Sequence, residues 1–219
     1  MKRSPLAWLL LGMLLSRLPV TARAGGTILF APDFSHGIPA RWENVSFFSK
    51  KTDYSVVHED TNVYLHAAAD SACSALSVKL DLAARAKLKL HWRWRIDGVN
   101  TNGSERELAA FDHAARVFVA FDTHIGPLRS LNYTWANVEP PGTLLPHPKS
   151  RRTQLFVAES GNGRAGQWVT EERDLAADWA RAFPGRPMPH IAGFGVMTDS
   201  DSLGGRLVGD YADIRLTAE

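Results

Sequence analysis

Two short segments combine aromatic rings with hydrogen-bonding groups, which is the chemistry that proteins use to hold sugars. In Asn132-Tyr133-Thr134-Trp135 side chains alternate along an extended chain, so Tyr133 and Trp135 share one face. Arg116 and Asp122 share the polar face of an earlier strand-like segment. Aromatic rings stack on sugar rings, while Arg, Asn and Asp side chains bind sugar hydroxyl groups. These residues therefore predict a glycan-binding groove.

The predicted site draws on several segments whose side chains we expect to meet on one open sheet face. Its members are Arg116, Asn132, Tyr133, Trp135, Glu159, Asp199 and Asp201, with Asp112 and Asp122 behind them. If the basic strand at residues 87–96 lines the same groove, its lysine and arginine side chains favour an anionic polysaccharide as the ligand.

Each of these residue types also has a structural interpretation. Aromatic rings dominate protein cores, so Tyr133 and Trp135 also fit core packing. Arg116 lies between apolar neighbours and needs an acidic partner if it is buried. Its candidate partners are Asp112, Asp122 and Glu159. The basic side chains of residues 87–96 also fit a solvated outer face of a sheet.

The sequence shows no compelling catalytic constellation. Retaining glycoside hydrolysis needs two carboxylates about 5 Å apart, and the nearest group, Glu171, Glu172 and Asp174, is explained by helix capping. Elimination needs a Tyr or His base beside a cation. Candidates by residue type are Tyr133, His91, His124 and Arg116. Ser160 and Cys73 lack the sequence surroundings of a nucleophile. A polysaccharide lyase or hydrolase is therefore an alternative to a binding domain, and a structural or partner-binding envelope protein is a third.

Metal-binding patterns are sparse. Asp199 and Asp201 offer oxygen ligands at alternating positions, as Ca²⁺ prefers, but such spacing is also typical of an Asx-rich turn. The eight His residues lack the spacing of a zinc site. We therefore expect no metal site and no cofactor, with a structural Ca²⁺ ion as the alternative.

Alternation of apolar and polar residues predicts the elements that position these side chains. It is strict from Lys87 to Ile96, where Trp92 and Trp94 fall on the apolar face and four basic residues and His91 fall on the other. Further strand-like segments are residues 27–30, 54–58, 62–68, 75–80, 115–124, 130–136, 154–160, 168–172, 191–198 and 210–216. Such a series predicts an all-β fold, a two-sheet antiparallel β-sandwich of jelly-roll type.

Little of the chain has a helical pattern. Asp174 caps one short predicted helix, Leu175 to Phe183, which Pro184-Gly185 ends. A helical turn is the further expectation for Glu105 to Phe111. Two long connections, residues 97–111 and 137–153, have the length of functional or mobile loops.

The first 24 residues have the three parts of a cleavable export signal. Lys2 and Arg3 precede an apolar run, and Ala22-Arg23-Ala24 forms a small-residue cleavage site. Residues 1–24 are thus a predicted signal peptide, and residues 25–219 a single domain without a membrane anchor. Cleavage removes four basic residues and no acidic one, so the formal net charge changes from +2 to −2. This charge gives no support to a nucleic-acid partner, and Cys73, the only cysteine, excludes an intramolecular disulfide.

Several sequence blocks resemble the bacterial exported proteins grouped as domain of unknown function 3047. The blocks are Trp92-Arg93-Trp94-Arg95-Ile96, Ala114-Ala115-Arg116-Val117-Phe118-Val119, Leu131-Asn132-Tyr133-Thr134-Trp135, Glu159-Ser160-Gly161, Gly166-Gln167-Trp168 and Met197-Thr198-Asp199-Ser200-Asp201. One departure is Asp112-His113, where the family has two adjacent acidic residues. The resemblance implies a secreted bacterial domain and no particular activity.

A looser similarity is to jelly-roll carbohydrate-binding modules, whose closing strand reads like Tyr211-Ala212-Asp213-Ile214-Arg215-Leu216. By analogy with such modules, Asp33 and Asp213 are candidates for holding a structural Ca²⁺ ion. We predict a periplasmic or secreted, monomeric, non-catalytic domain that binds a carbohydrate or cell-envelope glycan.

Overall fold

The computed structural model describes residues 26–46, 49–123 and 126–219. The predicted signal peptide, residues 1–24, and the candidate base His124 lie outside these ranges. Within them, no helix has both the length and the apolar character needed to cross a membrane.

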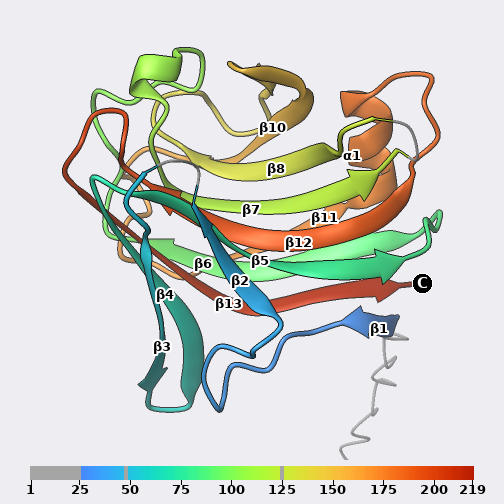
Figure 1. The fold of residues 1–219 in the computed structure, drawn as a ribbon, viewed down its shortest axis with the longest axis horizontal. Coiled ribbons are helices and arrows are strands. Elements are labelled where there is room, and N and C mark those ends of the chain that lie inside the picture. Colours follow the sequence, from blue (N-terminus) through green and yellow to red (C-terminus); the bar gives the residue numbers. More distant parts are fainter. Residues whose placement is uncertain (1–25, 47–48, 124–125) are drawn as a thin grey trace, which may run out of the picture.

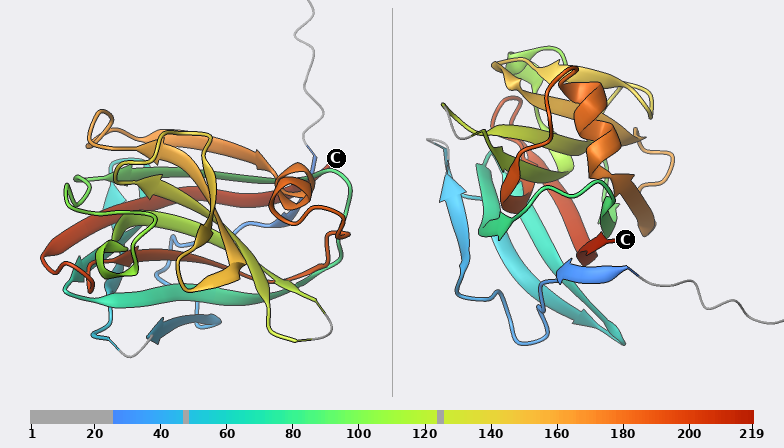
Figure 2. Two further views of the ribbon diagram at one scale, coloured as in Figure 1. Left: turned by 90° about the horizontal axis from the view of Figure 1, so that it is seen from above. Right: turned by 90° about the vertical axis from the view of Figure 1, so that its right-hand side faces the viewer.

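Two β-sheets pack face to face (Figure 1 and Figure 2). Sheet A has the order β11-β6-β13-β4-β3, with β1 beside β13. Its strands are β1 (Thr27–Phe30), β3 (Asp53–Glu59), β4 (Asn62–Asp70), β6 (Leu88–Ile96), β11 (Val169–Asp174) and β13 (Arg206–Ala218). Sheet B has the order β2-β5-β12-β7-β8-β10-β9. Its strands are β2 (Trp42–Ser46), β5 (Cys73–Leu82), β7 (His113–Asp122), β8 (Arg129–Ala136), β9 (Leu144–His147), β10 (Ser150–Ser160) and β12 (His190–Asp199).

This arrangement confirms the predicted all-β sandwich of jelly-roll type with one short helix. One pairing departs from the antiparallel expectation, because β10 runs parallel to β8. The chain leaves β8, reaches the sheet edge as β9 and returns as β10, so β10 lies between β8 and β9. Strands β2 and β9 are additions to the predicted set.

Strand β6 shows how the alternating pattern builds the core. Its apolar side chains, Leu88 through Ile96 at every second position, are at most 1% exposed. Trp92 and Trp94 pack against the rings of Tyr133 and Trp135, with ring centres 5.3 and 5.7 Å apart. Burial of such large rings supplies most of the hydrophobic stabilisation of a sandwich this size.

The basic side chains of β6 lie on the outer face of sheet A, where acidic side chains pair with them. Arg93 Nε is 2.6 Å from Asp213 Oδ2, and Arg95 Nη2 is 2.8 Å from Asp210 Oδ2. The interpretation of this face as an outer sheet surface is therefore the one that the structure supports.

Helix α1 (Leu175–Ala182) closes one end of the sandwich beside β8 and β11 (Figure 1). Asp174 caps it, since its Oδ1 accepts hydrogen bonds from the backbone N–H groups of Ala176 and Ala177, each at 3.0 Å. The predicted turn at residues 105–111 is the short 3₁₀ helix η1 (Leu108–Ala110).

A second, smaller hydrophobic cluster lies on the outer face of sheet B. Its members are Phe111, Ala136, Leu145, Leu155 and Val157. It fixes η1 and β9 against the outward-facing side of β8 and β10, and these two segments become walls of the pocket described next.

Candidate functional site

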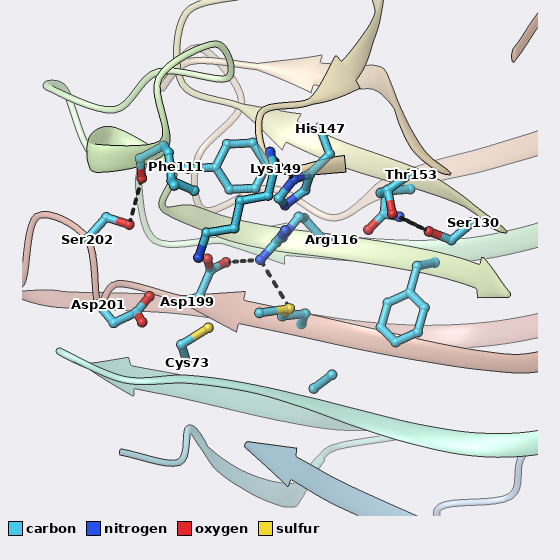
Figure 3. A pocket seen from close by; sticks show the side chains of 15 residues that line it. Cys73, Phe111, Arg116, Ser130, His147, Lys149, Thr153, Asp199, Asp201 and Ser202 are labelled. Atoms are coloured by element: carbon cyan, nitrogen blue, oxygen red, sulfur yellow. Dashed lines mark hydrogen bonds and ion pairs between the residues drawn. The ribbon is translucent and has the colours of Figure 1, made fainter. Parts of the chain in front are cut away.

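A pocket of about 430 Å³ opens on the outer face of sheet B (Figure 3). Five strands, β5, β12, β7, β8 and β10, contribute outward-facing side chains. The rest come from η1 and the residue after it, from the end of β9 and the turn that follows, and from the loop after β12. The lining residues are Cys73, Ala75, Leu108, Phe111, Arg116, Phe118, Ser130, Asn132, His147, Lys149, Thr153, Met197, Asp199, Asp201 and Ser202. The lining therefore combines two aromatic rings with charged, amide and hydroxyl groups, as in many small-molecule sites.

Strand register arranges the pocket floor in rows. Phe118 is opposite Gly195 on β12 and opposite Asn132 on β8. A side chain on Gly195 would collide with Phe118, because a Cβ atom there would lie 2.3 Å from the ring atom Cζ. The absent side chain therefore lets the Phe118 ring lean across β12 as part of the pocket floor.

A buried ion pair lies beside this ring. Arg116 Nη2 donates to Asp199 Oδ1 at 2.6 Å and also contacts Met197 Sδ at 3.1 Å. The two charged residues are 4% and 2% exposed, and the Arg116 guanidinium lies over the Phe111 ring. Among the described residues the buried Nε of Arg116 has no hydrogen-bond partner.

Burial sets the protonation chemistry of the pocket. It raises the pKa of the Asp199 carboxyl to about 6, although the Arg116 guanidinium opposes this shift. It lowers the pKa of His147 to about 4, so this imidazole is neutral at pH 7. Burial also raises the pKa of the Cys73 thiol to about 12, which keeps it protonated and a poor nucleophile.

Three potential metal ligands meet at one end of the pocket. The Cys73 sulfur and one oxygen each from Asp199 and Asp201 lie within 4.8 Å of one another. Ca²⁺ requires six to eight oxygen ligands, and one of these two carboxylates already binds Arg116. The cluster by itself therefore does not fit a calcium site, and the hydrogen bonds of the two carboxylates come from the side chains of Arg116 and Ser49.

The family model of "Protein of unknown function (DUF3047)" matches residues 40–215. The chain belongs to this family. Among curated protein sequences none matches this DUF3047 chain significantly.

Several solved structures are similar to the DUF3047 chain. One is the family 11 carbohydrate-binding module from Clostridium thermocellum in complex with a β-1,3-1,4-mixed-linked tetrasaccharide, with 14% identity, coverage of 89% of this chain and 96% of that one, and a TM-score of 0.45. The K3 adhesin domain of Lys-gingipain from Porphyromonas gingivalis has 11% identity, coverage of 88% and 100%, and a TM-score of 0.47. A xyloglucanase domain from Sinorhizobium fredii, in complex with cellobiose, has 6% identity, coverage of 87% and 100%, and a TM-score of 0.46.

Four of the predicted site residues line the pocket of the DUF3047 domain: Arg116, Asn132, Asp199 and Asp201. Asn132 Nδ2 donates to the Ser130 hydroxyl at 3.1 Å, and the Ser49 hydroxyl donates to Asp201 Oδ2 at 2.6 Å. These bonds orient the amide and the carboxylate at the pocket surface.

Tyr133 and Trp135 do not line the pocket, so their prediction as ligand-binding residues is wrong. Both are fully buried on the inner face of β8. The Tyr133 hydroxyl donates to Asp178 Oδ2 at 2.9 Å, and Trp135 Nε1 donates to the Gly161 carbonyl. Alternation correctly places them on one face, but that face is the core.

Asp112, Asp122 and Glu159 also lie outside the pocket lining, and none is the partner of Arg116, which is Asp199. Asp112 lies behind the pocket wall, where its two oxygens accept from backbone N–H groups of Ser202 and Leu203. Asp122 ends β7, opposite His190 in the strand register. Glu159 Oε1 lies 2.5 Å from Arg164 Nη1.

The basic residues of β6 do not share the pocket, since they lie on the outer face of sheet A. The condition for an anionic ligand is therefore not met.

Two lining residues outside the predicted set carry different sequence signals. Phe118 falls on the same face as Arg116 in the alternating pattern of β7, and this signal could have found it. Lys149 follows β9 in a proline-containing connection, and no pattern in that segment distinguishes it from other loop residues.

The candidate calcium ligands Asp33 and Asp213 line a second pocket, of about 440 Å³, between sheet A and the segment after β1. Asp213 accepts from Arg93, and Asp33 accepts from the backbone N–H of Ser35 at 2.8 Å. A Ca²⁺ ion bound by both would have to replace the Arg93 contact. The structural ion remains a prediction.

Proposed function

We propose that this domain binds a neutral oligosaccharide in the pocket on sheet B and does not alter it chemically. The observation that carries this proposal is the Phe118 ring beside the fixed polar groups of Arg116, Asn132 and Asp199. A sugar ring has an apolar face, which packs on an aromatic ring, and hydroxyl groups at its edge, which both donate and accept hydrogen bonds. The pocket offers partners for both parts.

The charges of the pocket favour a neutral ligand. Arg116 and Lys149 are positive, while Asp201 and the Arg116-bound Asp199 are negative. His147 adds no charge at pH 7, because its pKa is lowered to about 4. An anionic polysaccharide would meet no excess positive charge. The hydroxyl groups of a neutral sugar can accept hydrogen bonds from the positive side chains and donate them to the negative ones.

The arrangement supports binding over catalysis. Asp199, the carboxyl in the pocket whose pKa is raised, is held by Arg116 at 2.6 Å and has little freedom to transfer a proton. The Cys73 thiol is kept protonated by burial. We further propose that the domain acts in the periplasm or outside the cell as a monomer, in line with the predicted signal peptide.

Gel electrophoresis in the presence of soluble polysaccharides tests this proposal. The panel contains neutral β-glucan, galactan and xylan, and acidic alginate and pectin. We expect at least one neutral polysaccharide to retard residues 25–219, and Phe118→Ala to weaken binding about tenfold, equivalent to about 1.4 kcal/mol.

The matched control is Trp168→Ala, which removes an aromatic ring from the outer face of sheet A, where it packs on Arg93 and Arg95. This variant should bind like the parent. Retardation by no polysaccharide, or equal loss in both variants, would contradict the proposal. New reducing ends or unsaturated products would show an enzyme instead.

A further inference from the structure

The pocket is closed at one end of the strands. There β12 ends at Asp199, and the chain continues through Asp201 and Ser202. Leu108 of η1 faces these residues, and the Ser202 hydroxyl reaches its carbonyl at 3.4 Å. Figure 3 shows Phe111, Asp201 and Ser202 at this end, and Ser130 and Thr153 at the other.

This end wall is fastened from behind. Asp112 binds the backbone N–H groups of Ser202 and Leu203 at 2.9 and 2.7 Å, which ties the segment before β7 to the loop after β12. Glu105 is fully buried and accepts from the backbone N–H of Asn137 at 2.6 Å. Hydrogen bonds that backbone N–H groups donate to carboxylates are among the stronger hydrogen bonds in proteins. The wall is therefore a fixed part of the fold.

A second side of the pocket is closed along β10. The hydrophobic cluster of Phe111, Leu145 and Leu155 packs the outer side of the edge strand β9 and of β10 against the residue after η1. The end of β9 and the turn after it place His147 and Lys149 beside Arg116, and the Lys149 side chain points into the pocket (Figure 3). A ligand is thus confined on two adjoining sides.

The floor stays low in the opposite direction along the strands. Past the row of Phe118 and Gly195, the next positions on the same face are Ala120 and Gly193, which pair with each other. Because one of these residues has no side chain and the other only a methyl group, no large side chain of this pair rises above the sheet at this point. A chain that occupies the pocket can therefore leave over these residues, but it cannot continue through the end wall.

We infer that the pocket receives the end of a glycan chain and not its interior. This inference rests on the proposed function. The pocket volume of about 430 Å³ is at the low end of the range for small-ligand pockets, about 300–1,000 Å³. This volume suits a short terminal stretch of a glycan chain. The terminal sugar has one more free hydroxyl than an internal sugar, and Asp199, Asp201 and Lys149 at the closed end supply partners for it.

Counting binding sites per gram of polysaccharide tests this inference. Each neutral polysaccharide of the panel is shortened by limited acid hydrolysis, which multiplies its chain ends about tenfold at constant mass. The binding capacity is then measured by titration calorimetry. Recognition of ends predicts that the capacity per gram rises about tenfold, because capacity counts sites. A cyclic β-glucan, which has no ends, should not bind.

Two outcomes separate this inference from the proposed function. Binding with unchanged capacity per gram, or binding of the cyclic glucan, would overturn recognition of ends while leaving glycan binding intact. Failure of every polysaccharide and fragment to bind would overturn both.

Discussion

Replacing Arg116 by Met is expected to destabilise the domain strongly, because it leaves the Asp199 charge buried without its partner. The two side chains are 4% and 2% exposed and lie 2.6 Å apart. Breaking such a pair by removing one member typically costs about 3–5 kcal/mol. For a domain of this size, about 2–4 °C of melting temperature is lost per kcal/mol. We therefore expect Arg116→Met to lower the melting temperature by about 6–20 °C near pH 8.

The loss should shrink in acid. Burial raises the pKa of Asp199 to about 6 in the folded protein, above the ordinary value for an aspartate. A raised pKa means that the folded state binds the proton more tightly, so this contribution to stability is greatest below about pH 4 and is lost as the pH rises through 6. Without the Arg116 cation nothing offsets the burial, and the pKa of Asp199 should rise further. At pH 5 the Asp199 carboxyl of Arg116→Met is then neutral, so the variant loses less stability relative to the parent than at pH 8.

Urea denaturation at pH 5 and pH 8 of four proteins measures these effects. They are the parent, Arg116→Met, Asp199→Asn, and the double variant. The double variant should be more stable than Arg116→Met alone at pH 8, since no charge is left buried. The reasoning is refuted if Arg116→Met costs less than about 1 kcal/mol, far below the cost of a broken buried pair, or if its cost is the same at both pH values.

Three further changes probe other parts of the domain. Gly195→Ala should displace the Phe118 ring, from which its Cβ would be 2.3 Å, and so reduce glycan binding in the electrophoresis assay; unchanged retardation would argue against Phe118 as the sugar platform. Glu171→Gln should raise the free energy of unfolding by about 1 kcal/mol in urea at pH 8.5. Burial raises the pKa of Glu171 to about 7, so the protonated carboxyl contributes fully to stability below pH 4.5, and this contribution is lost as the pH rises through 7. A loss of stability in the variant at pH 8.5 would contradict this account. Tyr133→Phe should cost about 1–2 kcal/mol by removing the hydrogen bond to Asp178, while glycan retardation stays as in the parent; reduced retardation would return Tyr133 to the binding residues.

Much of the fold could be predicted from alternation and capping alone. The strict pattern of β6 gives its buried face, and Asp174 before an amphipathic segment gives the start of α1. Strands β2 and β9 carry weaker signals. Strand β2 is only five residues long, and β9 is four residues long and includes Pro146, which argues against a strand by propensity. Pairing at the sheet edges, where a missing N–H is tolerated, overrides that propensity.

The candidate site was only partly predictable, because period two shows which side chains share a face but not which face is the core. Tyr133 and Trp135 share a face with each other and Asn132 lies on the opposite one, as the sequence predicts. The same alternation would be found in the sequence if the face with Tyr133 and Trp135 were turned to solvent, so alternation alone does not identify the core face. The partner of Arg116 is also hidden from local patterns, since Asp199 lies 83 residues away and meets it only through the pairing of β7 with β12.

The parallel pairing of β8 with β10 explains why a pocket exists on sheet B at all. Antiparallel neighbours can be joined by a tight turn, but a chain that re-enters parallel to its neighbour must first travel back along the sheet. Here the return is made by β9, whose Leu145 packs on the outward-facing side chains of β10, and the turn that follows places Lys149 over the pocket. Every other described strand pairing is antiparallel. The one exception in topology is therefore also the source of the wall that turns an open sheet face into a binding pocket.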